Sequence, residues 1–141
     1  MLGRILLISF FAFVVSLSSF AQSAPDSIKS SPAYAEALLR RTELLADIEA
    51  LSADYTDTNP KMLDLRYELA SLDKSLEKIF AVKPTETARL TEALGKLIVR
   101  RAAVDAEVNR LGRSYSKDHP DVKRAMRRLD IFDSAINEIL R

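Results

Sequence analysis

The chain repeats itself after sixty residues. Between residues 34–80 and residues 94–140, nine of the 47 aligned pairs are identical. The identical residues, given by their positions in the first copy, are Arg40, Arg41, Ala46, Leu51, Tyr55, Pro60, Leu69, Asp73 and Ile79. Because these identities keep one register throughout, the sequence predicts two copies of one structural unit.

Apolar residues in both copies alternate at spacings of three and four. In the first copy they are Leu44, Ile48, Leu51, Tyr55 and then Met62, Leu65, Leu69, Leu72, Leu76, Ile79; in the second they are Val104, Val108, Leu111, Tyr115 and then Val122, Ala125, Leu129, Phe132, Ile136, Ile139. Side chains at this spacing share one face of a helix, as in a coiled coil. The pattern therefore predicts an all-α, coiled-coil-like fold.

Proline indicates where three of the helices begin. Ser31-Pro32, Asn59-Pro60 and His119-Pro120 each place a capping side chain before a proline. At the first helical position the missing N–H of proline costs no hydrogen bond. Pro84 breaks the chain again, and Thr85 is the expected cap of a further helix. The predicted helices span residues 32–55, 60–80, 85–115 and 120–140.

Short connections make consecutive helices antiparallel, so each repeat is expected to be a helical hairpin. The sequence predicts two tandem hairpins, residues 32–80 and 85–141, joined by a linker at 81–84. Residues 22–31 are expected to form a flexible leader. The short linker favours packing of the hairpins as a four-helix bundle, and two independent rods are the alternative.

Residues 1–21 have the pattern of a secretory signal peptide. Arg4 supplies the positive charge, an uncharged stretch runs from 5 to 20, and Ser19-Phe20-Ala21 places small residues at the cleavage site. Cleavage is predicted after Ala21, with cleavage after Ser23 as the alternative. The protein is then expected to be exported, periplasmic and soluble. An uncleaved helix in the inner membrane is the other interpretation, although a span needs about 20 apolar residues.

The composition argues against several classes of functional site. The chain has no cysteine, one histidine and three glycines, which excludes cysteine-ligated metals, histidine-rich metal sites and glycine-rich phosphate loops. Without Arg4, 20 basic and 20 acidic side chains remain, a balance that argues against nucleic-acid binding. His119 could act as a general base, but no nucleophile accompanies it, and a helix cap is the favoured interpretation. We therefore predict no enzyme, no cofactor, no metal and no small-molecule substrate.

Two arginines interrupt the apolar seams at equivalent places. Arg41 and Arg101 lie in heptad register with the apolar residues that follow them, and an unpaired buried charge is costly. Antiparallel pairing brings Asp73 within one turn of Arg41, and Asp133 within one turn of Arg101. We predict one register-setting ion pair in each hairpin. The alternative is an arginine that extends along a wet edge to reach solvent.

Each hairpin turn contains a tyrosine five residues before a proline. These are Tyr55 with Pro60 and Tyr115 with Pro120. Each tyrosine is the last seam residue before the turn, so packing over the hairpin tip is the favoured role. Contact with a partner is the alternative.

The second of these turns carries a family resemblance. Residues 111–122 read Leu-Gly-Arg-Ser-Tyr-Ser-Lys-Asp-His-Pro-Asp-Val. This segment resembles the Leu…Tyr…His-Pro-x-Val turn of polysaccharide co-polymerases, the bacterial chain-length regulators and exopolysaccharide-export proteins. In that family the element reverses a periplasmic coiled-coil hairpin, and Asn59 replaces the histidine in the first copy here. The resemblance implies a periplasmic hairpin and a connection with polysaccharide export or assembly.

The two repeats differ in charge. Residues 22–80 contain 7 Lys+Arg and 11 Asp+Glu, a net charge of −4, whereas residues 81–141 contain 13 and 9, a net charge of +4. Four basic residues share one helical face: Lys123, Arg124, Arg127 and Arg128. We expect the basic hairpin to dock on the acidic one, within the chain or between copies, through apolar residues such as Leu38, Leu45, Phe80 and Ile98. A solvated basic face is the alternative.

These observations favour a non-enzymatic, exported coiled-coil protein that binds a protein partner in the cell envelope or associates with itself. The alternative function is a small periplasmic chaperone or stress adaptor that holds unfolded clients on an amphipathic helical surface.

Overall fold

The computed structural model describes residues 24–141, and the signal peptide predicted at 1–21 lies outside the described residues. Its helices are α1 (Ala24–Lys29), α2 (Pro32–Ser52), α3 (Pro60–Phe80), the 3₁₀ helix η1 (Pro84–Arg89), α4 (Glu92–Ser114) and α5 (Pro120–Leu140). Residues 24–141 contain no strand, so the predicted all-α fold is confirmed for this part of the chain.

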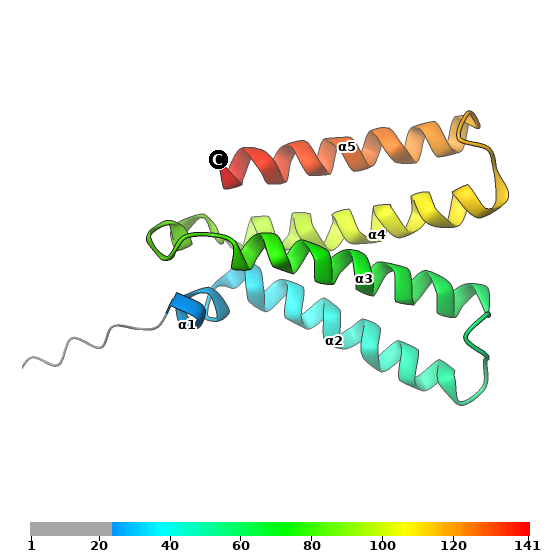
Figure 1. Cartoon of the computed structure of the whole chain (residues 1–141), viewed down its shortest axis with the longest axis horizontal. Helices are drawn as coiled ribbons and strands as arrows, with labels where there is room; N and C mark the ends of the chain where they lie inside the picture. Colours follow the sequence, from blue (N-terminus) through cyan, green and yellow to red (C-terminus); the bar gives the residue numbers. More distant parts are fainter. Residues whose placement is uncertain (1–23) are drawn as a thin grey trace, which may run out of the picture.

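Helices α2 and α3 form the first hairpin, and α4 and α5 form the second (Figure 1). Helix α4 is the centre of the arrangement because it packs against α2, α3 and α5. Helices α2 and α5 lie at opposite edges, and α5 packs chiefly along α4 (Figure 1). The four long helices therefore pack together as expected, but in an open arrangement in which α4 occupies the groove of the first hairpin.

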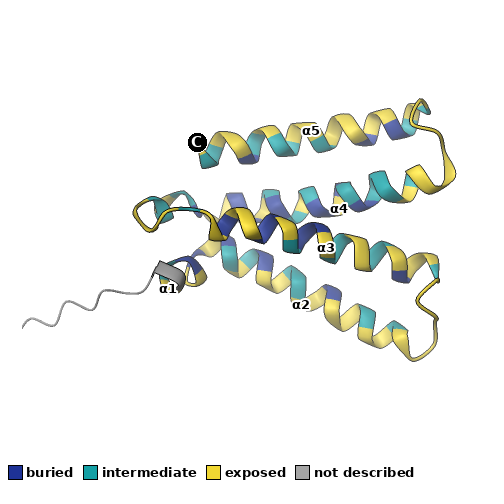
Figure 2. Cartoon of the chain, viewed as in Figure 1, coloured by how far each residue is buried: buried dark blue, intermediate teal, exposed yellow. Residues whose placement is uncertain are grey.

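The core lies towards the open end of the hairpins, where α1, η1 and the C-terminus gather (Figure 2). One cluster of buried residues comprises Ile28, Ala33, Ala37, Leu44, Leu72, Leu76, Ile79, Leu90, Leu94, Ile98, Ala102 and Ile136. Both hairpin turns lie at the other end and are mostly exposed. The buried core that the two hairpins share therefore lies at the open end.

Small residues let α2 and α4 approach closely. Ala33 and Gly95 are both buried, and a Cβ atom built on Gly95 would lie 2.9 Å from the Ala33 carbonyl oxygen. Of the residues expected to join the hairpins, Ile98 is fully buried, but Leu38, Leu45 and Phe80 remain 41%, 41% and 44% exposed. Those three are exposed because α4 packs against a different side of the first hairpin.

The three helix caps predicted before prolines are present. The Oγ of Ser31 accepts a hydrogen bond from the Tyr34 amide at 3.3 Å, and the Oδ1 of Asn59 accepts one from the Lys61 amide at 2.9 Å. The Nδ1 of His119 likewise accepts from the Asp121 amide at 3.2 Å. In each case the next residue is the proline that begins the helix, so sequence and structure agree on these starts.

Two predictions near the helix ends are wrong. Within the leader expected to be flexible, residues 24–29 form α1, and Ile28 is only 4% exposed because it joins the core. The third long helix begins at Glu92 rather than at residue 85, and its cap is Thr91 rather than Thr85. Leu90 separates η1 from α4, since its side chain is buried and its carbonyl accepts a hydrogen bond from the Ala33 amide at 3.2 Å.

The long helices end slightly earlier than predicted at the two turns. Helix α2 ends at Ser52 and α4 at Ser114, so Tyr55 and Tyr115 lie beyond the helices. None of the helices described in residues 24–141 is both long enough and apolar enough to cross a bilayer.

Candidate interaction surfaces

A polar cluster around Arg101 joins three helices. The Nε of Arg101 donates to Asp133 Oδ1 on α5 at 3.2 Å, so the predicted ion pair is present. Its Nη1 donates to Asp105 Oδ2 at 2.7 Å and to Ser71 Oγ on α3 at 2.9 Å. Ser71 Oγ in turn donates to Asp105 Oδ2 at 2.6 Å. Arg101 therefore connects its own hairpin to the first hairpin, which the predicted pair alone did not include.

Burial and ion pairing shift the pKa of Arg101 in opposite directions. Burial disfavours its charged form, but the hydrogen bond to Asp133 and the charge of Asp105 outweigh this effect and raise the pKa of Arg101 above its ordinary value. Asp105 could have been found from the sequence, because it follows Arg101 by four residues on the same helix. Ser71 gave no such signal, since it comes from the other hairpin.

The equivalent ion pair in the first hairpin involves fewer residues and is more exposed to solvent. Arg41 Nε donates to Asp73 Oδ1 at 2.8 Å, so this predicted pair is also present. The side chain of Arg41 is 39% exposed and that of Asp73 is 43% exposed, whereas the side chain of Arg101 is 17% exposed. Exposed ion pairs contribute little to stability, so we expect the Arg41 pair to stabilise the protein less than the Arg101 cluster does.

The second hairpin turn exposes a stacked aromatic pair. The rings of Tyr115 and His119 lie 4.2 Å apart between centroids, with an angle of 25° between their planes. His119 also caps α5, so its Nδ1 is occupied by the Asp121 amide. Tyr115 nevertheless remains 46% exposed. The two rings stack on each other, and the exposed part of Tyr115 leaves an aromatic surface at the turn.

The first hairpin turn presents a comparable tyrosine without the stack. Tyr55 is 50% exposed, and Asn59 occupies the place of the histidine. Asp57 in this turn accepts a hydrogen bond from Arg66 Nη2 at 2.6 Å. Both turns lie at the same end of the molecule (Figure 1), and each contains one of the two tyrosines.

The basic face of α5 does not dock on the first hairpin. Lys123 pairs with Asp118 at 2.9 Å, Arg124 with Asp121 at 2.6 Å, and Arg128 with Glu107 at 2.9 Å, all within the second hairpin. Arg127 is exposed. The basic hairpin does dock on the acidic one, as expected, but through α4, which packs against α2 and α3, and not through this face of α5.

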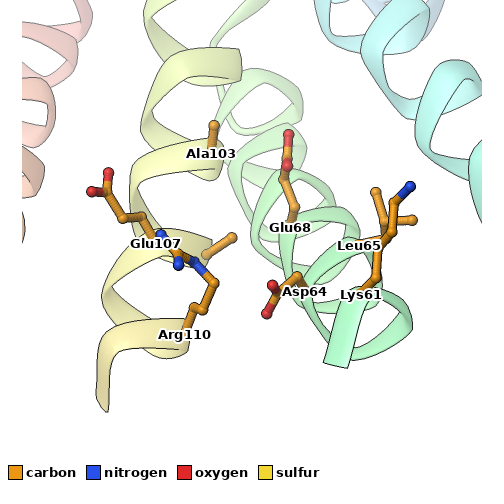
Figure 3. A pocket seen from close by; sticks show the side chains of 8 residues that line it. Lys61, Asp64, Leu65, Glu68, Ala103, Glu107 and Arg110 are labelled. Carbon is orange, nitrogen blue, oxygen red and sulfur yellow. The ribbon is translucent and has the colours of Figure 1, made fainter. Parts of the chain in front are cut away.

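A depression of about 210 Å³ lies between α3 and α4 (Figure 3). Its lining residues are Lys61, Asp64, Leu65, Glu68, Ala103, Ala106, Glu107 and Arg110. The carboxylates of Asp64, Glu68 and Glu107 already pair with Arg113, Arg40 and Arg128, respectively. Within the described residues no group of three or more His, Asp or Glu side chains is arranged to hold a metal ion.

The turn motif at residues 111–122 supplies a resemblance of sequence only. In the structure this segment contains the end of α4, the Tyr115–His119 stack and the beginning of α5. Comparison of the chain with protein-family models, with curated proteins and with solved structures finds no match.

Proposed function

We propose that the protein is an exported, non-enzymatic binding protein that contacts a protein of the cell envelope through the end formed by its two hairpin turns. The observation that carries this proposal is that repeat-related tyrosines lie in both hairpin turns, and the two turns are at one end of the molecule. Tyr55 and Tyr115 are about half exposed, and both follow the ends of long helices packed on one core. Tyrosine suits an interface because it offers a large rigid ring and a hydroxyl that stays hydrated.

The signal-like residues 1–21 and the turn resemblance at 111–122 support a periplasmic location for this role. The resemblance to polysaccharide co-polymerases favours a partner in polysaccharide export or assembly. The carboxylates around the depression between α3 and α4 are engaged in ion pairs, which favours binding between macromolecules over chemistry on a small substrate.

Capture from the envelope tests the role of the tyrosines. The full chain with a C-terminal tag should retain a specific envelope protein, and Tyr55→Ser with Tyr115→Ser should lower its recovery at least about tenfold, as for loss of central aromatic anchors. Tyr67→Ser is the matched control, because Tyr67 is 37% exposed on α3, away from the turns. Equal losses in both variants would contradict a role for the turns.

The intact mass of the captured chain should also show an N-terminus at Gln22, and a mass that includes Met1 would contradict cleavage.

A chaperone function is the second candidate, and exposed apolar side chains favour it. Ile131 is 68% exposed, Leu39 59% and Met126 45%. Leu39 lies on α2, whereas Met126 and Ile131 lie on α5. Single exposed apolar residues are common in soluble proteins. Suppression of the aggregation of an unrelated unfolded client, at an equal molar ratio, would favour this function over the first.

A further inference from the structure

The interface between the hairpins is built from two faces that repeat along the chain. One is the groove of the first hairpin, where Leu44 and Leu72 are fully buried. The other is the inward face of α4, where Leu94, Ile98 and Arg101 meet that groove. Because the hairpins are copies of one unit, each face has an equivalent sixty residues away on the other hairpin.

The equivalent of the inward face of α4 lies on α2 and is partly exposed; within the chain Tyr34 packs against Phe80 and Arg41 pairs with Asp73. Leu38 stands sixty residues before Ile98, and Leu45 sixty before Asp105. Ile98 is completely buried, whereas Leu38 and Leu45 are each 41% exposed. We call Tyr34, Leu38, Arg41 and Leu45 the α2 outer face.

The equivalent of the first groove lies between α4 and α5. It is a depression of about 160 Å³ lined by Arg100, Ala103, Val104, Glu107, Arg128 and Phe132. Each of these residues stands sixty positions after a residue of the first hairpin: Arg40, Glu43, Leu44, Asp47, Glu68 and Leu72. Ile131, the equivalent of the buried Ser71, is 68% exposed beside it. We call this depression the α4–α5 groove.

From this correspondence we propose that the protein assembles head to tail, with the α2 outer face of one copy seated in the α4–α5 groove of the next. The second copy would repeat the packing that α4 makes inside the chain. The α2 outer face lies on one edge helix, and the α4–α5 groove includes α5 at the opposite edge (Figure 1), so one contact leaves the other free. Such a heterologous contact propagates into a ring or a filament.

Charge supports a second copy as the occupant. In the first hairpin Arg40 pairs with Glu68 at 2.8 Å, but their equivalents Arg100 and Arg128 are both basic, and Arg128 pairs instead with Glu107 at 2.9 Å. A copy seated like α4 places Glu36 and Glu43 where Lys96 and Ala103 stand in the chain, and both of those residues lie close to Arg40 and Glu68. The acidic residues of one copy would thus face Arg100 and Arg128 of the next. The net charges of the two halves, −4 for residues 22–80 and +4 for residues 81–141, also favour contact of the first hairpin of one copy with the second hairpin of the next.

Disulfide trapping tests the predicted register, since the chain has no cysteine of its own. A Cβ atom on Gly95 would lie 2.9 Å from the Ala33 Cα, so the equivalent Ala35 of one copy should approach Ala93 of the next. The full chain is expressed as Ala35→Cys and as Ala93→Cys, and the purified variants are mixed and oxidised. We expect a linked dimer from the mixture and a ladder of multimers from the double variant. The control is Ala35→Cys mixed with Ala70→Cys, an exposed position on α3, which should give no linked product.

Sedimentation equilibrium gives a second, independent measurement. Leu38→Asp should weaken association at least about tenfold, because it places a charge at the centre of the contact. Leu63→Asp should leave association unchanged, since Leu63 is 40% exposed on α3 and belongs to neither face. Matching thermal unfolding of the two variants verifies that both remain folded. A protein that stays monomeric at every soluble concentration, equal association of the two variants, or self-linking of Ala35→Cys as strong as in the mixture would overturn the proposal.

Discussion

Replacing Gly95 by alanine should lower the free energy of unfolding by about 2 kcal/mol, within the range for overpacked cores. The added Cβ would lie 2.7 Å from the Glu36 Cβ and 2.9 Å from the Ala33 Cα. The Ala33 atoms belong to the backbone, so the clash is relieved only if α2 moves away from α4. That movement would loosen the centre of the core, where Ala33 is completely buried.

Gly112 offers a matched control on the same helix. A Cβ there meets nothing within 4 Å. Gly112→Ala should therefore leave stability unchanged or raise it by up to about 1 kcal/mol, because alanine favours helix more than glycine does. Urea unfolding of both variants measures the difference. Equal stability of the two variants would show that α2 and α4 are not in close contact.

The Arg101 cluster carries the second large effect. Arg101→Leu should destabilise the protein by about 2–3 kcal/mol, because it leaves Asp105 and Asp133 without their common partner in a half-buried site. The same change at the equivalent Arg41 should cost less than about 1 kcal/mol, since that pair is largely exposed.

A double-mutant cycle isolates the interaction with Asp133. Asp133→Leu combined with Arg101→Leu should recover part of the loss, with a coupling of about 1–2 kcal/mol. Recovery stays incomplete because Asp105 still faces the position of Arg101. Purely additive effects in thermal unfolding would show that Arg101 and Asp133 do not stabilise each other.

The helices and their internal pairs could be predicted because their causes are local in the repeat. The heptads and the caps at Asn59 and His119 gave α3 and α5 their observed bounds. Arg41 and Arg101 stood at seam positions, where the predicted acid on the partner helix compensates each of them. Each of these predictions needed one hairpin alone.

What could not be predicted depends on how the hairpins meet. Segregation of charge indicated the basic face of α5, but close packing requires small side chains, and Ala33, Gly95 and Ala102 bring α4 into the first hairpin. Ser71 entered the Arg101 cluster for the same reason. Helix α1 is too short to be stable alone, and its place depends on the burial of Ile28 in that shared core.

The central claim is that the second hairpin is seated in the groove of the first, which brings both turns to one end of the molecule. Distances between spin labels on Thr58→Cys and Lys117→Cys test this directly, because both residues are exposed in the turns and the chain has no other cysteine. Dilution with unlabelled protein removes contributions from neighbouring copies. We expect a single narrow distance distribution that is unchanged by salt, since the core between the hairpins is apolar. A broad distribution, as for two rods that move independently about residues 81–84, would contradict the account.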